Sequence, residues 1–426
     1  MQKSIAVPEM QKLRFGIFFI YNTISRGFKN INMEIRSLLS EFSVNPDGRS
    51  RRSSGYFTEN RFFCSNLFSQ NIWGIRACMK FRMIFVLIFA AAVLGACSGG
   101  NQEKRLKIGF AMDTLKEERW QRDHDAFEAH CKHLNVECVI TVADNKTDKQ
   151  ANDVDNLLTQ GIDVLVIAPH DATQAASMVD KAKAQNIPVI SYDRLINSDK
   201  IDVYISHQVP VIGKKISEYA IQHVPKGNYV MVYGSSKDNN ALIMKTSELA
   251  VLQPAIDKGD IKIVAENFMD DWKPELALNF AENALTQSND NIQAFVVSND
   301  GMAGGVISAL GKRGLAGKVL VTGQDAGLEA LQNIAEGKQT MTVYKPIIPL
   351  ASAAVEAAIK LAKKEKLDTK PFHNDAPSVN KDVPSILLEV TSVDKSNLMD
   401  TVIKDGYAKY EDVYKNVPEA DRPKKP

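Results

Sequence analysis

The chain has 426 residues, of which 52 are Lys or Arg and 51 are Asp or Glu, so its formal net charge is +1. Residues 98–426 taken alone carry 39 basic and 46 acidic side chains, a net charge near −7, which argues against nucleic-acid binding. That part contains no run of about 20 apolar residues that could span a bilayer, and its length suits two domains of ordinary size.

Residues 79–97 have the pattern of an export signal. Two basic residues precede an apolar run over 83–93, and small residues then lead to Cys97. The last four residues resemble the lipobox of bacterial lipoproteins, in which the cysteine is acylated; a chance apolar stretch of a protein core is the alternative. Acyl chains on Cys97 would hold the protein at a membrane surface.

An export signal lies at the start of a translated chain. We therefore expect translation to begin at Met79 or Met83, and residues 1–78 to be an over-extended gene start or a disordered leader. Residues 98–105 are polar and are predicted to tether the lipid anchor to the folded body.

Beyond the tether, short apolar runs typical of strands alternate with amphipathic stretches typical of helices. This pattern predicts parallel sheets covered on both faces, and two such series predict two doubly wound α/β lobes. Strands are expected at 106–112, 136–143, 163–169, 188–192 and 202–206 in the first series, and at 228–234, 261–266, 293–298, 318–323 and 340–344 in the second.

Three segments are candidate crossings between the lobes: the polar break at 206–213, the pair 345–346 and the end of the apolar run 385–390. A chain that crosses three times forms a hinge rather than a simple linker. The predicted domains are lobe 1 over 106–206 and 346–388, lobe 2 over 207–345 and 389–413, and a flexible tail over 414–426.

Of the five cysteines, only Cys131 and Cys138 lie in the predicted folded body. An oxidising periplasm would allow a disulfide, but one cysteine falls at a predicted helix end and the other in the next strand. Spacing alone fixes no geometry, and we expect two buried thiols rather than a disulfide.

Polar side chains directly follow the predicted strands, where ligands of open parallel sheets bind. Carboxylates there can accept hydrogen bonds from adjacent hydroxyls and Arg, Lys and Asn can donate them, while indole rings can stack on the C–H faces of a sugar. The candidates are Asp193 and Arg194 after 188–192, Asn239 and Asn240 after 228–234, Asn299 after 293–298, Asp325 after 318–323, Lys345 after 340–344, and Trp120 and Trp272 in loops of the same class.

Each candidate also has a structural interpretation. Trp120 would belong to the buried stripe of its helix, and Trp272 would pack against the start of the next one. Asp193 and Arg194 would form a surface ion pair. Asp300 suits the cap of the following helix better than a ligand contact.

Enzyme signatures are missing from the sequence. The run at 311–313 lacks the Ser or Thr of a phosphate loop, and HExxH and GxSxG do not occur. His124, His130 and His133 share a predicted helix among charged neighbours, which favours a solvated face over a metal site. The sequence therefore predicts a binding protein without enzymatic activity, cofactor or metal.

Nine motifs occur between residues 106 and 407: ERWQRD (118–123), DVLVIAP (163–169), SYDRLIN (191–197), DNNA (238–241), DDWKPE (270–275), SNDGMAGG (298–305), GQDAG (323–327), QTMTVYKP (339–346) and TVIKDGY (401–407). Together they resemble the periplasmic D-xylose-binding proteins of ABC importers. The resemblance implies a type I periplasmic binding protein fold, in which two doubly wound parallel-sheet lobes joined by a three-crossover hinge close on one pentose.

The resemblance also implies roles for the candidates. Trp120 and Trp272 would sandwich the sugar ring, and Arg119 would donate beside Asp193 and Arg194. The remaining hydrogen bonds would come from the second lobe and the hinge, through Asn239 or Asn240, Asn299, Asp325 and Lys345. The turn at 207–213 departs from the acidic or Asn-containing turn of the family, so the first hinge segment is expected to flex differently. The lipobox is a second departure.

The predicted function is capture of D-xylose, or a close monosaccharide, by a lipid-anchored monomer that faces the periplasm. An ABC permease or the periplasmic domain of a sensor kinase would then recognise the closed form. Ribose, galactose or a furanosyl signal are the alternative ligands. The effector domain of a sugar-responsive repressor would share the architecture, but it needs a helix-turn-helix before residue 106, where the lipobox lies.

Overall fold

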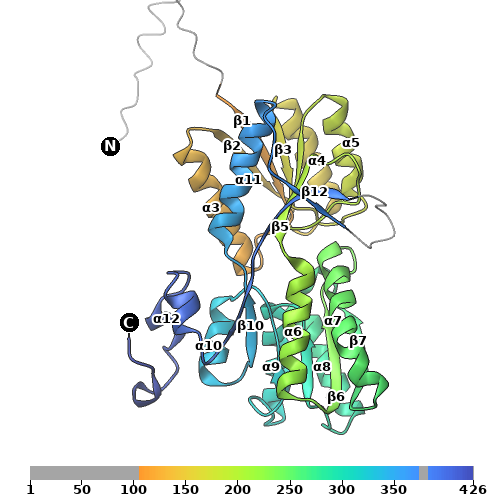
Figure 1. Cartoon of the computed structure of the whole chain (residues 1–426), viewed down its shortest axis with the longest axis vertical. Helices are drawn as coiled ribbons and strands as arrows, with labels where there is room; N and C mark the ends of the chain where they lie inside the picture. Colours follow the sequence, from red (N-terminus) through yellow and green to blue (C-terminus); the bar gives the residue numbers. More distant parts are fainter. Residues whose placement is uncertain (1–104, 374–381, 426) are drawn as a thin grey trace, which may run out of the picture. The chain divides into compact units, whose positions relative to one another are not determined.

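The computed structural model describes residues 105–373 and 382–425. The predicted leader, the signal peptide with Cys97 and nearly all of the tether therefore lie outside the described residues. The described chain folds into two lobes, each with a parallel sheet between layers of helices (Figure 1). The two α/β lobes predicted from the sequence are thus confirmed.

Lobe 1 contains a seven-stranded sheet in the order β11-β12-β5-β4-β3-β1-β2, which is parallel except for the edge strand β11. Its helix α11 packs against α3, although the two are far apart in the sequence (Figure 1). The elements are β1 (Lys107–Met112), α3 (Glu118–His133), β2 (Glu137–Val142), α4 (Thr147–Thr159), β3 (Val164–Ile167), α5 (Ala175–Ala184), β4 (Val189–Tyr192), β5 (Val203–His207), α11 (Ile347–Ala362), β11 (Lys370–Phe372) and β12 (Val383–Leu388).

Lobe 2 contains a four-stranded parallel sheet in the order β7-β6-β8-β9 and a separate two-stranded sheet, β10-β13. Its elements are α6 (Val209–His223), β6 (Gly227–Tyr233), α7 (Asn239–Asp257), β7 (Ile261–Phe268), the 3-10 turn η1 (Asp270–Trp272), α8 (Pro274–Gln287), β8 (Ala294–Val297), α9 (Asp300–Lys312), β9 (Leu320–Val321), α10 (Leu328–Glu336), β10 (Met341–Tyr344), β13 (Thr391–Asp394), the short π-helix η2 (Met399–Ile403), α12 (Tyr410–Val413) and the 3-10 turn η3 (Glu419–Asp421).

The strand predicted at 340–344 forms, but it does not join the parallel sheet. It is β10, and it pairs antiparallel with β13, with Thr342 opposite Val393. The path of the chain explains the difference: β10 leads out of lobe 2 into α11, and β13 leads back into lobe 2 from β12. Adjacent strands that leave and enter the same lobe run in opposite directions.

The central strands of both parallel sheets are buried on both faces, which explains their continuous apolar runs. In β1, Phe110 packs in the core beneath α3 and α11, while its neighbour Ala111 packs in the core beneath α4 and α5. In β8, Phe295 and Val296 divide in the same way between the two cores of lobe 2. In these central strands, the polar side chains that face the lobe interface come from the strand ends.

Three segments connect the lobes and are bonded to one another. The amide of Gln208 donates to the carbonyl of Leu388 at 3.0 Å, and Nε2 of His207 lies 3.2 Å from the carbonyl of Pro346. Burial, reinforced by the nearby Lys345 cation, lowers the pKa of His207 to about 3. The ring is therefore neutral at neutral pH, and Nε2 donates to the carbonyl.

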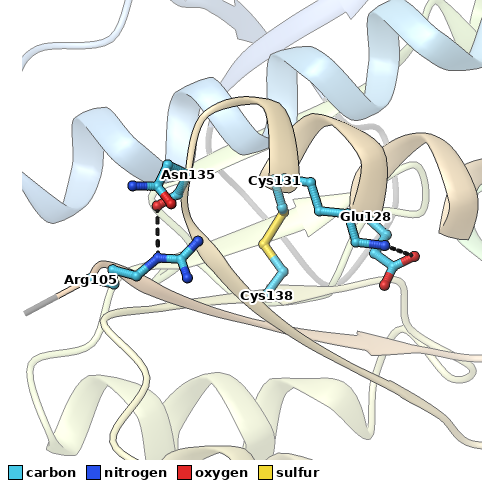
Figure 2. The surroundings of a disulfide bond; sticks show 6 residues. Arg105, Glu128, Cys131, Asn135 and Cys138 are labelled. Atoms are coloured by element: carbon cyan, nitrogen blue, oxygen red, sulfur yellow. Dashed lines mark hydrogen bonds and ion pairs between the residues drawn. A yellow bond between two sulfur atoms is a disulfide. The ribbon is translucent and has the colours of Figure 1, made fainter. Parts of the chain in front are cut away.

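Cys131 and Cys138 form a disulfide, so the expectation of two thiols is wrong. Cys131 lies in the last turn of α3 and Cys138 near the start of β2, with their Cα atoms 6.2 Å apart (Figure 2). Asn135 adopts a φ of 56°, which reverses the chain directly after the helix, and Nε of Arg105 donates to its carbonyl at 3.1 Å. The pairing depends on this single turn, which the cysteine spacing does not reveal.

Removing the disulfide is expected to lower the free energy of unfolding by about 2 kcal/mol, because the unfolded chain loses the restriction of a short closed loop. Urea denaturation of a Cys131→Ala/Cys138→Ala variant beside the wild type measures this loss. Trypsin can cleave after Lys132, between the two cysteines. Mass spectrometry of a non-reduced digest should therefore find their peptides joined, and two separate peptides would show that the bond does not form.

Candidate functional site

A cavity lies between the lobes at the carboxyl ends of the strands, with an empty volume of about 320 Å³ that is partly open to solvent. Such a position is the usual ligand site of open parallel sheets. The lining residues are Glu117, Arg119, Trp120, Asp193, Arg194, Asp238, Asn240, Trp272, Asn299, Gln324, Asp325 and Lys345. Of the ten ligand-binding residues predicted from the sequence, only Asn239 is missing from this lining.

Arg119 and Asp193 form the charged centre of the lobe 1 wall. The guanidinium of Arg119 donates to Asp193 Oδ2 at 2.8 Å, and its other nitrogens donate to Asp123, one helical turn further along α3. Burial of Asp193 would raise its pKa, but Arg119 and Lys345 outweigh that effect and hold the pKa well below its usual range. Asp193 is therefore an ionised acceptor that faces the cavity.

Arg194 joins the two lobes and does not pair with Asp193, so the surface ion pair considered from the sequence is wrong. Its Nη1 donates to Asp113 Oδ2 at 2.7 Å and to the carbonyl of Pro169 at 3.1 Å, both in lobe 1. Its Nε lies 2.8 Å from Asp238 Oδ2 at the start of α7 in lobe 2. A buried guanidinium thus sits between one carboxylate of each lobe.

Lobe 2 contributes a second set of paired polar groups. Lys345 Nζ lies 2.8 Å from Asp325 Oδ1, which is also 3.8 Å from Arg119 in the opposite lobe. The amide of Asn240 donates to the backbone and side chain of Asp193 at 3.2 and 3.3 Å. Fixed donors and acceptors therefore surround the cavity from both sides.

Asn239 and Asn240 play different parts, although they are adjacent. Asn240 faces the cavity, whereas the side-chain amide of Asn239 donates to the carbonyl of Leu195 at 2.7 Å and to Asn197 Oδ1 at 2.6 Å in lobe 1. Successive helical residues point about 100° apart, so only one of the two can face the ligand. Asn239 instead bonds the two lobes to each other directly.

The two tryptophans line the cavity and are almost fully buried, with 2% of Trp120 and 6% of Trp272 exposed. The guanidiniums of Arg119 and Arg194 lie 4.3 and 5.0 Å from the ring centre of Trp120. Each ring also packs in the hydrophobic core of its lobe. Trp120 therefore belongs to the buried stripe of its helix and also lines the cavity.

Trp272 is held in place by a glycine and an acid. A Cβ atom at Gly234 would lie 2.2 Å from the indole ring, so only glycine lets the ring lie against the end of β6. Its Nε1 donates to Asp238 Oδ2 at 3.2 Å, the oxygen that also contacts Arg194. The orientation of this ring is therefore coupled to the ion pair between the lobes.

The helix cap predicted at Asp300 lies one residue earlier. Asn299 is the cap of α9, and its Oδ1 accepts from the amide of Met302 at 2.9 Å. Asp300 instead accepts from the amide of Gly327 at 3.0 Å and bonds Thr342, which ties α9 to the start of α10 and to β10. The extended conformation of residue 299 places its side chain back over the helix end, as a cap requires.

Three lining residues were not predicted from the sequence: Glu117, Asp238 and Gln324. Asp238 directly precedes the two asparagines, and Gln324 directly precedes Asp325, so the rule of polar residues after strands would have included both. Glu117 is one residue ahead of the ERWQRD motif, and no spacing signal distinguishes it from its charged neighbours.

No helix among the described residues is long and apolar enough to cross a bilayer. The same part of the chain contains no group of three or more His, Cys, Asp and Glu side chains arranged to hold a metal ion. His124 pairs with Asp125 at 3.0 Å and His130 with Glu356 at 3.4 Å, so these two ring nitrogens contact carboxylates rather than a shared centre.

Comparison with known proteins adds to this geometry. Residues 108–366 match the model of the family described as periplasmic binding protein domain. The D-xylose-binding periplasmic protein of Escherichia coli (strain K12) is 41% identical over 331 residues, which are 78% of this chain and 99% of that protein. The protein of the same name from Haemophilus influenzae is 40% identical over 336 residues, 79% of this chain and 100% of that protein.

Among solved structures, a carbohydrate transporter solute binding protein from Chloroflexus aurantiacus, in complex with D-glucose, matches with a TM-score of 0.67 and 29% identity. The match covers 72% of this chain and 98% of that one. The resemblance and the fold class predicted from the sequence are both confirmed by these matches.

Proposed function

Because this chain belongs to the family of periplasmic binding proteins, we propose that it captures D-xylose, or a neutral monosaccharide close to it, in the cavity between its lobes. Members of this family bind solutes and are not enzymes, which agrees with the sequence prediction. The observation that carries the proposal is one cavity with an indole from each lobe and paired charges around it.

The chemistry of the lining suits an uncharged polyol. Asp193 and Asp325 are acceptors for sugar hydroxyls, and Arg119 and Lys345 are donors to ring and hydroxyl oxygens. Because each of these charges has an opposite charge within 3 Å, a ligand with its own net charge would leave one of them uncompensated. The indoles of Trp120 and Trp272 supply apolar surface for the C–H faces of the ring.

The mechanism is closure about the hinge. A sugar that contacts both lobes binds the closed form better than the open form and shifts the population toward it. The closed form would then be recognised by an ABC permease or by the periplasmic domain of a sensor kinase, with the protein acting as a monomer. D-xylose is favoured over ribose, galactose or a furanosyl ligand because the relatives at 40–41% identity are named for it.

Sugar binding is tested by titration calorimetry with common pentoses and hexoses. Trp272→Ala and Asp193→Ala are each expected to weaken D-xylose binding by at least about 2 kcal/mol, or about 30-fold, because one removes an aromatic anchor and the other a buried acceptor. Asp180→Ala, which changes an exposed carboxylate paired with Lys200, is the control and should leave affinity unchanged. Unaltered affinity in either cavity variant would remove that residue from the site.

We further propose a periplasm-facing protein held at a membrane by acyl chains on Cys97, on the basis of the lipobox pattern alone. Cys97→Ser is expected to move the protein from the membrane fraction to the soluble periplasmic fraction of the producing cell, because the anchor cannot be attached. Equal amounts of wild type and variant in the membrane fraction would count against the anchor.

A further inference from the structure

A second, larger cavity adjoins the first and has an empty volume of about 1150 Å³, which includes open solvent. The two share five lining residues: Glu117, Arg119, Trp272, Asn299 and Asp325. We propose that this outer cavity is a second sugar subsite, so that the protein also takes a neutral disaccharide whose first ring occupies the inner cavity. The proposal rests on the sugar-binding function proposed above.

Relative size supports a ligand of two rings. The outer cavity has more than three times the empty volume of the inner one, and both volumes include open solvent. Any substituent on the ring edge next to Glu117 and Trp272 would extend into the outer cavity. A second ring linked at that edge has space there that the inner cavity lacks.

Glu117 stands at the junction with an unused hydrogen-bonding atom. Its Oε2 is buried and has no hydrogen-bond partner within the protein. Burial raises the pKa of Glu117, the nearby Arg194 opposes this effect, and Asp113 and Asp325 add to it. A carboxyl group that lines both cavities and has an unsatisfied oxygen is placed to accept a hydrogen bond from a ring hydroxyl next to the bridge between two rings.

The walls of the outer cavity favour a neutral ligand over an anionic one. The starts of α3, α8, α9 and α10 meet there, and their amide ends would attract an anion. Each helix, however, has an acid in its first turn, namely Glu118, Glu275, Asp300 and Glu329. The cation Lys273 is already paired with Asp271 at 2.8 Å.

The wall of the outer cavity has free space at Gly301, and the surrounding packing does not require a glycine at this position. A Cβ atom there would meet its nearest neighbour, Pro274 Cγ, at 3.6 Å, an ordinary contact, and the residue does not have a positive φ. A larger side chain would therefore enter the outer cavity without disturbing the helix. Gly301 does not line the inner cavity, so Gly301→Leu fills one cavity and spares the other.

The test is calorimetric titration of the full chain with D-xylose and with xylobiose, its neutral disaccharide. We expect the wild type to bind xylobiose within tenfold of D-xylose. Gly301→Leu should weaken xylobiose at least tenfold and change D-xylose less than twofold. Glu117→Gln should weaken xylobiose at least fivefold more than it weakens D-xylose, and the exposed Glu218→Gln on α6 should change neither.

Each contrary outcome has one meaning. If the protein binds D-xylose but not xylobiose, the second subsite is wrong and the proposed function stands. The outer cavity would then be only the entrance to the inner one. Equal effects of Gly301→Leu on both sugars would also overturn it. Failure of every sugar to bind would overturn the proposed function and the subsite with it.

Discussion

Replacing Glu248 by glutamine is expected to raise the free energy of unfolding at pH 7 by about 3 kcal/mol and to remove the contribution of Glu248 to its pH dependence between about 4.5 and 8. Glu248 lies on the buried face of α7, one turn after Met244 and one turn before Leu252, and it is fully buried. Neither of its carboxyl oxygens has a hydrogen-bond partner.

The direction of the effect follows from proton binding. Burial raises the pKa of Glu248 from 4.5 to about 8, against a weaker opposing effect of Lys245. The folded protein therefore keeps this proton up to about pH 8, whereas the unfolded chain releases it near pH 4.5. The stabilisation from proton uptake is complete below pH 4.5 and is lost as the pH rises to about 8.

The magnitude follows from the same difference. At pH 7, about 2.5 pH units above the pKa of the unfolded carboxyl, folding requires Glu248 to take up a proton. This uptake costs about 3 kcal/mol. Glutamine has the shape of the protonated carboxyl and cannot ionise, so the variant is expected to match the wild type near pH 4.5 and to exceed it increasingly up to pH 8.

Urea denaturation at pH 5, 6, 7 and 8 measures this difference. Glu218→Gln is a matched control, because its exposed carboxylate on α6 is only loosely paired with Lys214 at 3.6 Å. That variant should follow the wild-type profile. Parallel pH profiles for Glu248→Gln and the wild type would show that Glu248 is ionised in the folded protein and that this explanation is wrong.

Arg194→Leu is expected to lower the free energy of unfolding by about 3 kcal/mol, because it leaves two buried carboxylates without their shared cation. Asp113 keeps a contact with His170 at 3.0 Å, and Asp238 keeps the amide of Asn240 and the indole of Trp272. None of these bonds supplies the permanent positive charge of a guanidinium. Because Asp238 lies in the opposite lobe, the variant should also weaken closure and sugar binding.

A double-mutant cycle with Asp238→Asn separates the pair across the lobes from the pair within lobe 1. We expect a coupling energy of about 1–3 kcal/mol between Arg194 and Asp238, since the two are in direct contact. Arg313→Leu is the control: it breaks an ion pair with Asp290 near the surface and should cost less than about 1 kcal/mol. A loss for Arg194→Leu no larger than that of the control would mean that the buried charges find other partners.

The lobes and most of the site could be predicted because both follow from local patterns. Apolar runs separated by amphipathic stretches indicate parallel sheets, and the carboxyl ends of parallel strands meet at one edge. Asp193, Asn299, Asp325 and Lys345 each follow a strand and therefore meet at the cavity. No knowledge of their partners is needed for that inference.

The pairing of these groups depends on features that no local pattern records. Asp193 pairs with Arg119 rather than with the adjacent Arg194, because the backbone at Asp193 has a φ of 58° and turns the two side chains apart. Cys131 and Cys138 meet only because of the reversal at Asn135.

By itself, the sequence determined that this chain forms two α/β lobes, and that tryptophans, carboxylates and cations follow their strands. Periodicity and residue type suffice for this, because they act within a single element. Only the tertiary structure decided that Arg194 bridges the lobes, that Asn240 and not Asn239 faces the cavity, and that Glu248 is buried without a hydrogen-bond partner. Those facts arise where separate elements pack together, and the relative orientation of two elements is not encoded in the spacing of either one.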